Sequence, residues 1–85
     1  MGPLIEQTIR AFIIDTFLFG ESNNEVTDTD SLLEKGIIDS TGVLELVGFI
    51  EETYGIKVKD EELIPENLDS IANVADFIRR KQAQL

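Results

Sequence analysis

Apolar residues recur at helical spacing in three separate stretches, and this pattern constrains the fold more than any other feature of the chain. The stretches run from Pro3 to about Phe19, from Ser40 to Tyr54 and from about Ser70 to Gln82. Each has polar residues on its other side, as expected of helices that bury one face. Gly20 and Gly55 follow the first two stretches, where glycine commonly ends a helix. The sequence therefore predicts three main helices.

The segments between these helices complete the predicted fold. Glu21 to Asp30 is a polar loop, and we expect the apolar residues that follow it to fold back onto the core. Asp60 to Leu63 is predicted to form one short helical turn, which Pro65 ends. Asp69 or Ser70 would cap the last helix. The predicted fold class is all-α, a four-helix bundle with three main helices, a short third helix and a long first loop.

The chain of 85 residues contains neither cysteine nor histidine. We expect a single domain over residues 1–85 that is held together by packed apolar faces, since no disulfide can form. Ser–His catalysis, thiol nucleophiles and the commonest metal ligands are also excluded, so an enzyme is not expected. Asp28 and Asp30 are spaced as in a calcium loop, but Leu33 stands where that loop requires glycine. No metal site is therefore predicted.

Acidic residues outnumber basic ones by 17 to 7, which gives a net charge of −10. Nucleic acid and anionic membranes are poor partners for such a surface, whereas basic protein surfaces attract it. No apolar run reaches membrane-spanning length, and the N-terminus lacks the pattern of a secretory signal. We expect a cytoplasmic, monomeric protein.

One segment carries the strongest functional signal. From residue 32 to residue 46 it reads LLEKGIIDSTGVLEL, with a glycine, two apolar residues, the pair Asp39-Ser40, and then an acidic amphipathic helix. This segment resembles the phosphopantetheine attachment region of acyl and peptidyl carrier proteins. The long loop before Asp39 resembles the family's first loop, and the stretch from Ile64 to Ile78 resembles its third and fourth helices. The string from Gly36 to Gly42 is most similar to stand-alone carriers that adenylating enzymes load, such as D-alanyl carrier proteins.

The resemblance implies a role for Ser40. A separate transferase would attach 4'-phosphopantetheine from coenzyme A to its hydroxyl, using magnesium. The thiol of that arm would hold acyl or aminoacyl groups as thioesters, in fatty acid or secondary metabolite biosynthesis. From the residues alone, Ser40 can equally be the N-cap of the second helix, and the two roles are compatible. Asp39 is either a solvated acid at the helix start or, by resemblance, a contact for the transferase and its metal.

The resemblance also implies a partner-binding surface on the second helix. Its partners would be the transferase, an adenylating or other acyl-loading enzyme, and downstream acyl-transfer enzymes with basic surfaces. Acids at helical spacing are otherwise an ordinary solvated face, and the apolar residues could belong to the core. The predicted partner-binding residues are Thr41, Leu44, Glu45, Val47, Glu51 and Glu52.

Two questions stay open at the level of sequence. The aromatic residues, among them Phe12, Phe49 and Phe77, could fill the bundle or line a pocket for cargo. Glycines such as Gly42 and Gly48 could ease helix movement or permit close packing. The alternative to a carrier is an acidic helical interaction domain that binds a basic partner and has no prosthetic group.

Overall fold

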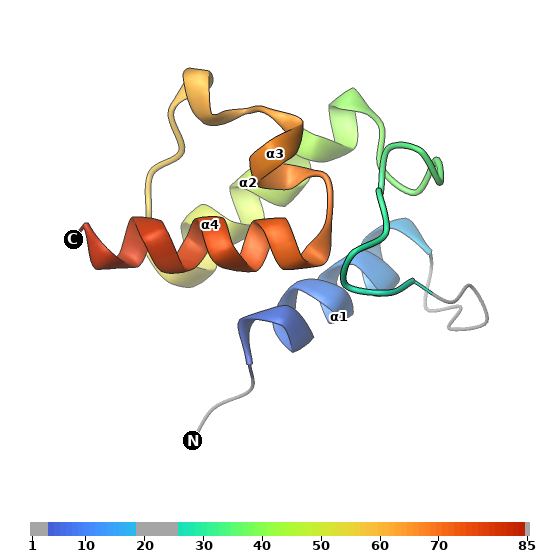
Figure 1. The fold of residues 1–85 in the computed structure, drawn as a ribbon, viewed down its shortest axis with the longest axis horizontal. Coiled ribbons are helices and arrows are strands. Elements are labelled where there is room, and N and C mark those ends of the chain that lie inside the picture. The colour runs from blue at the N-terminus through green and yellow to red at the C-terminus, as the bar shows by residue number, and fades with distance from the viewer. Residues whose placement is uncertain (1–3, 19–25, 85) are drawn as a thin grey trace.

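A computed structural model describes residues 4–18 and 26–84 of the chain, which form a small helical bundle (Figure 1). These residues contain no strand, so the predicted all-α class is confirmed. The described elements, in chain order, are α1 (Ile5–Phe17), α2 (Ser40–Tyr54), the 3₁₀ turn η1 (Asp60–Glu62), α3 (Pro65–Leu68) and α4 (Ile71–Ala83).

Local signals in the sequence account for most of the helix boundaries. Helix α2 spans the predicted residues and ends at Gly55, which adopts a left-handed conformation with φ of 67°. Helix α4 is capped by Ser70, whose Oγ accepts a hydrogen bond from the Asn73 N–H at 3.0 Å. Helix α1 begins at Ile5 and ends at Phe17. The predicted first position and stop signal of α1, Pro3 and Gly20, lie outside the described residues.

The predicted helical turn at Asp60 to Leu63 is present as the 3₁₀ turn Asp60–Glu62, but the role predicted for Pro65 was wrong. Pro65 does not end this turn and instead begins the separate helix α3. Proline suits a first helical position because its φ is already helical and no hydrogen-bond donor is needed there. The Ile64 carbonyl accepts from the Leu68 N–H at 3.2 Å and closes the turn.

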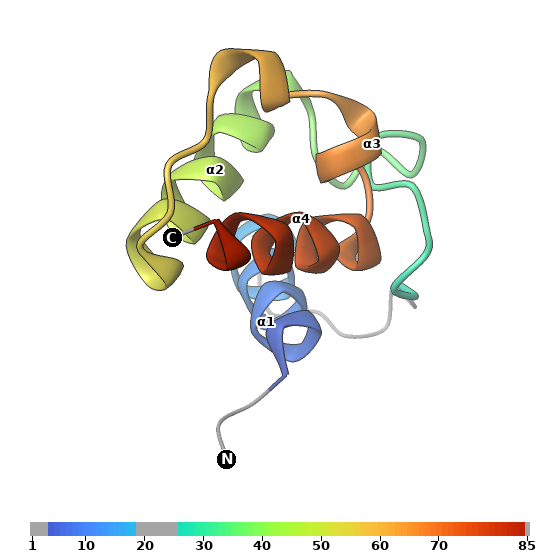
Figure 2. The same ribbon diagram turned by 60° about the vertical axis from the view of Figure 1, so that its left-hand side comes forward.

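The core is built around α4, which packs against α1 on one side and α3 on the other (Figures 1 and 2). Its Phe77 is among the largest fully buried side chains. The first loop also contributes, because Val26, Leu32 and Ile38 are buried in the same apolar cluster. This confirms the expectation that the second half of the loop folds back onto the core.

Polar contacts hold the first loop in place. The Arg10 guanidinium donates to the Val26 carbonyl and pairs with the Asp28 carboxylate. The Asp69 carboxylate accepts from the Ser31 hydroxyl at 2.6 Å and from the Leu33 N–H at 2.9 Å. Since Asp69 lies just before α4, these bonds tie the loop to both α1 and α4. These contacts therefore fix the position of the loop that leads into α2.

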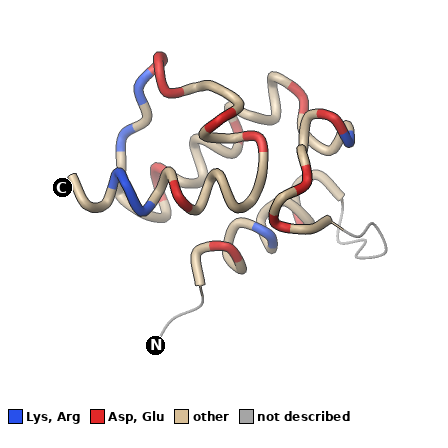
Figure 3. The backbone as a smooth tube through the Cα atoms, in the orientation of Figure 1, with Lys and Arg blue, Asp and Glu red and all other residues tan. Residues whose placement is uncertain are grey.

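Charge is unevenly distributed over the bundle (Figure 3). Helix α2 contains no lysine or arginine, whereas basic residues gather near the C-terminal end of α4 and on the connector beside it. Several of these are engaged in ion pairs, such as Arg79 with Glu6 and Lys81 with Glu62. Helix α2 carries the acids Glu45, Glu51 and Glu52 and no basic residue, so its own charge is negative. No helix in residues 4–18 and 26–84 is long and apolar enough to cross a membrane.

Candidate functional site

The start of α2 is organised by Asp39. Its carboxylate accepts a hydrogen bond from the Gly42 N–H at 2.7 Å, and its carbonyl accepts from the Val43 N–H at 3.0 Å. Asp39 is therefore the N-cap of α2, and Ser40 is the first helical residue. The prediction that Ser40 could cap the helix is wrong, because the preceding aspartate already occupies that position.

This arrangement leaves the Ser40 hydroxyl available. Ser40 is exposed, and its hydroxyl has no hydrogen-bond partner among the described residues. The backbone N–H groups of the first turn that Asp39 does not cap point out of the helix start, where the helix dipole is positive. An anionic group joined to the Ser40 oxygen would meet favourable electrostatics there.

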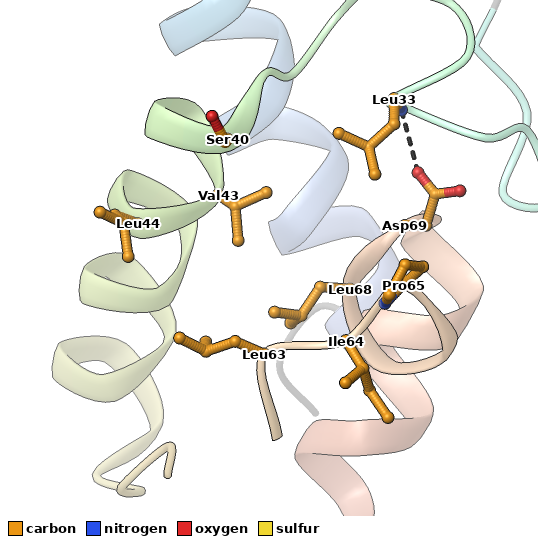
Figure 4. A pocket seen from close by; sticks show the side chains of 9 residues that line it. All are labelled: Leu33, Ser40, Val43, Leu44, Leu63, Ile64, Pro65, Leu68 and Asp69. Carbon is orange, nitrogen blue, oxygen red and sulfur yellow. Dashed lines mark hydrogen bonds between the residues drawn. The ribbon is translucent and has the colours of Figure 1, made fainter. Parts of the chain in front are cut away.

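An apolar pocket of about 260 Å³ opens beside Ser40 (Figure 4). It lies between the first turns of α2, the first loop, and the segment around α3. Leu33, Leu44 and Ile64 on its rim are unusually exposed for large apolar residues, at 41%, 60% and 40%. The full lining is Leu33, Ser40, Val43, Leu44, Leu63, Ile64, Pro65, Leu68 and Asp69.

Most of this pocket was not identified from the sequence. The walls are aliphatic, and none of the aromatic residues considered for such a pocket lines it. The available signal was the pair Leu63-Ile64, two large apolar residues between the acidic run of residues 60–62 and Pro65. The aromatic residues instead pack within the bundle, where Phe12 stacks on Phe49 with ring centroids 4.1 Å apart.

The predicted partner-binding residues differ in how far they are exposed. Thr41 and Leu44 are exposed near Ser40, but Val47 is only half-exposed and packs against the core. Glu51 is half-buried, and its carboxylate accepts a hydrogen bond from the Val58 N–H at 2.9 Å. Glu51 thus holds the connector after α2 rather than facing solvent freely.

The other two predicted acids lie further round the helix. Glu45 and Glu52 are exposed and make no ion pair among the described residues. At about 100° per residue they lie about 120–140° round the helix from Ser40 and about 80–100° from Leu44. The structure thus separates an apolar side of α2 beside Ser40 from an acidic side facing α1.

Gly42 allows neighbouring side chains to pack closely against the first turn of α2. A Cβ atom at this position would lie 2.8 Å from Cε1 of Phe17 and 3.3 Å from Cγ2 of Ile38. Glycine thus lets α1 and the first loop approach the first turn of α2. Of the two alternatives for this glycine, the structure supports close packing.

The titratable groups with shifted pKa values lie away from Ser40. The pKa of Glu62 is lowered by hydrogen bonds from the Lys59 N–H and from Lys81. The pKa of Glu6 is lowered by the Arg79 guanidinium, and that of Asp30 by the Thr27 N–H and Lys35. These shifts mark ion pairs that join parts of the fold. The described residues contain no cluster of acidic side chains suited to hold a metal ion.

A small helical bundle with an exposed serine hydroxyl at a helix start, beside an apolar pocket, has the features of a carrier for a covalently attached arm. The model of the phosphopantetheine attachment site family matches residues 18–78. The chain belongs to this family of carrier proteins, whose prosthetic group is covalently attached 4'-phosphopantetheine. The resemblance seen in the sequence is thereby confirmed.

Individual relatives support the same assignment. An acyl carrier protein of Akkermansia muciniphila is 36% identical over 78 residues, which cover 92% of each chain. A D-alanyl carrier protein of Streptococcus uberis is 31% identical over 77 residues, or 88% of this chain and 96% of the relative. A solved structure titled "Crystal structure of FAD-dependent dehydrogenase" contains a chain with a TM-score of 0.72 and 31% identity. The match covers 82% of this chain and 97% of that chain.

Proposed function

We propose that Ser40 is the phosphopantetheine attachment site, and that the protein carries acyl or aminoacyl thioesters between partner enzymes without catalysing their chemistry. The observation that supports this most strongly is that Asp39, and not Ser40, is the N-cap of α2. Asp39 caps the helix, so the exposed Ser40 hydroxyl has no structural hydrogen bond to lose when it is modified. The attached arm would supply the thiol that this cysteine-free chain lacks.

The residues around Ser40 would position the arm. The Ser40 oxygen forms the bond to phosphorus, and the uncapped N–H groups of the first turn favour the negative charge of the phosphodiester. Asp39 fixes the direction of the helix start through its bond to Gly42. Its second carboxylate oxygen has no partner among the described residues and can contact the transferase and its magnesium ion.

The pocket beside Ser40 supports a proposal about the cargo. Its walls are almost entirely aliphatic, so the hydrocarbon part of an acyl or aryl group would be removed from water there. The ammonium group of an aminoacyl cargo would gain little there, because the carboxylate of Asp69, the one acid in the lining, already accepts from Ser31 and Leu33. Among the two cargo classes named for the relatives, we therefore propose an apolar acyl group that rests against Leu44, Leu63 and Ile64.

The proposed partners are the transferase, an adenylating or other acyl-loading enzyme, and downstream acyl-transfer enzymes. The chain matched in the structure titled for an FAD-dependent dehydrogenase adds a flavin-dependent dehydrogenase to the classes worth testing. We further propose that the protein is cytoplasmic. We also propose that it is a monomer, because its charge of −10 opposes self-association.

The test is the intact mass of the protein after incubation with coenzyme A, magnesium and a broad-specificity phosphopantetheinyl transferase. We expect the mass to increase by one phosphopantetheine group in the wild-type chain and not in Ser40→Ala. The variant should fold normally, because an exposed serine that is not the N-cap contributes within about 0.5 kcal/mol. An unchanged mass of a folded, initially unmodified protein would favour the acidic interaction domain instead.

A further inference from the structure

Asp69 is an exception in the lining of the pocket beside Ser40. Apart from these two residues, the lining is aliphatic. A carboxylate does not favour contact with an apolar chain, because removing its charge from water costs free energy. The Asp69 side chain does not cap α4 either, since the Ser70 hydroxyl does so. The hydrogen bonds that the carboxylate accepts indicate what it does instead.

Both oxygens of this carboxylate bind the first loop. Oδ1 accepts from the Leu33 N–H at 2.9 Å, and Oδ2 accepts from the Ser31 hydroxyl at 2.6 Å. The Ser31 oxygen in turn accepts from the Glu34 N–H at 3.1 Å. These bonds hold residues 31–34 against the end of α3, where Asp69 is the C-cap. We call the two bonds from Ser31 and Leu33 to the carboxylate the Asp69 latch.

The latch fixes Leu33 rather than its neighbour Leu32. Leu32 is 1% exposed and belongs to the core cluster, and its N–H donates to the Asp69 backbone carbonyl at 2.7 Å. Leu33 is 41% exposed and lies outside that cluster, and its carbonyl accepts from the Gly36 N–H within the same loop. Without the carboxylate, packing and a backbone bond would still hold Leu32. Leu33 would lose the bond that ties it to α3.

The Leu33 side chain forms one wall of the pocket. Figure 4 shows it pointing into the pocket from the first loop, across from Val43 on α2. The first loop contributes no other side chain to the lining. A displacement of Leu33 alone would therefore open this side of the pocket.

We propose that the Asp69 carboxylate determines which length of apolar chain the pocket accepts, by holding Leu33 as a wall. With the latch closed, the pocket of about 260 Å³ ends at Leu33 and favours a short chain. Without the latch Leu33 moves outward, so that short chains lose a contact and longer chains extend along the loop. The inference rests on the proposed function only in taking the pocket to hold the carried acyl group. Asp69 is a positioning residue, because it acts through Leu33.

The probes are two free alcohols, hexanol and decanol, which enter the pocket without the arm. Each is titrated into isotope-labelled full-length chain that carries Ser40→Ala, and the backbone amide shifts of Val43, Leu63 and Leu68 give its Kd. The readout is the Kd of hexanol divided by that of decanol, because a general loss of stability affects both alcohols alike. We expect Asp69→Ala to raise this ratio at least tenfold, which burial of about two further methylene groups would produce.

Two matched variants serve as controls. Asp69→Asn keeps the latch, because its amide can accept from the Leu33 N–H and donate to the Ser31 oxygen. Asp28→Ala removes another carboxylate that ties down the first loop, but this one pairs with Arg10 and does not line the pocket. Both variants should leave the ratio within twofold of its value in the chain without them.

A further variant removes the wall and leaves the latch intact. Leu33→Ala truncates an exposed side chain outside the core cluster, so the chain should fold even if Asp69→Ala does not. It should raise the ratio as Asp69→Ala does. Circular dichroism of each variant shows whether the helices are retained.

The outcomes separate this inference from the proposed function. An unchanged ratio in folded Leu33→Ala or Asp69→Ala would overturn the inference, and so would an equal rise in Asp28→Ala. Alcohol shifts confined to Phe12 and Phe49, which line a hollow between α1 and α2, would also overturn it. Because the titrated chain cannot be modified, none of these results depends on phosphopantetheine. Failure of the mass test with the wild-type chain would instead refute the proposed function, whatever the alcohols show.

Discussion

Asp39 caps α2 and is proposed to contact the transferase, and substitution can separate these two roles. Its carboxylate caps α2 by accepting from the Gly42 N–H at 2.7 Å, and it stands next to the proposed modification site. Asparagine retains a side-chain oxygen that can accept the same hydrogen bond, whereas alanine does not. Asp39→Asn should therefore keep the cap and remove only the negative charge. Asp39→Ala should remove both.

The expected stability change follows from the capping bond. Loss of an N-cap costs about 1 kcal/mol, so Asp39→Ala should lower the free energy of unfolding by that amount. For a domain of this size the melting temperature should fall by roughly 4–8 °C. Asp39→Asn should stay within about 0.5 kcal/mol of the wild type, since asparagine and aspartate are comparable caps. Thermal and urea unfolding followed by circular dichroism measure both values.

The rate of modification then tests the second function. We expect the transferase to load Asp39→Asn at least tenfold more slowly than the wild type, as followed by intact mass over time. Because the cap is retained, a slow rate in this variant reports the missing carboxylate and not a disordered helix start. If Asp39→Asn folds and loads as the wild type does, Asp39 is only a cap, and the reasoning about transferase contact is refuted.

Three further results are expected. Gly42→Ala should lose about 1–2 kcal/mol of stability, because its new Cβ atom would lie 2.8 Å from Phe17. Gly48→Ala should gain up to about 1 kcal/mol, because its Cβ atom meets nothing within 4 Å. Urea unfolding of both variants measures the contrast. Glu62→Gln should have a lower free energy of unfolding than the wild type above pH 5. This difference should vanish as pH falls through the lowered pKa of Glu62, because the wild-type carboxylate then loses its charge. A difference that grows in acid would contradict this expectation. Added salt should raise the melting temperature by screening the net charge of −10, and a constant or falling melting temperature would show that self-repulsion is unimportant.

Sequence reasoning located α2 and α4 because their ends are fixed by contacts over a few residues. Gly55 takes a left-handed conformation directly after the last turn of α2, and Ser70 bonds to the N–H three residues later. The cap of α2 was misassigned for a related reason. Asp39 and Ser40 are both good cap residues, and a shift of one position decides between them. Only the backbone geometry shows that the aspartate has the extended conformation of a cap.

The pocket and the two sides of α2 depend on contacts between residues far apart in sequence. Leu33 reaches the pocket because its N–H donates to Asp69, 36 positions along the chain, and no local pattern encodes that bond. The acids of α2 look equivalent in sequence, yet Glu51 is drawn inward by the Val58 N–H while Glu52 stays exposed. Helical spacing predicts which residues share a side of a helix. What each side faces is set by how the first loop and the connector after α2 pack, so this one helix has an apolar side beside the pocket near Ser40 and an acidic side along α1.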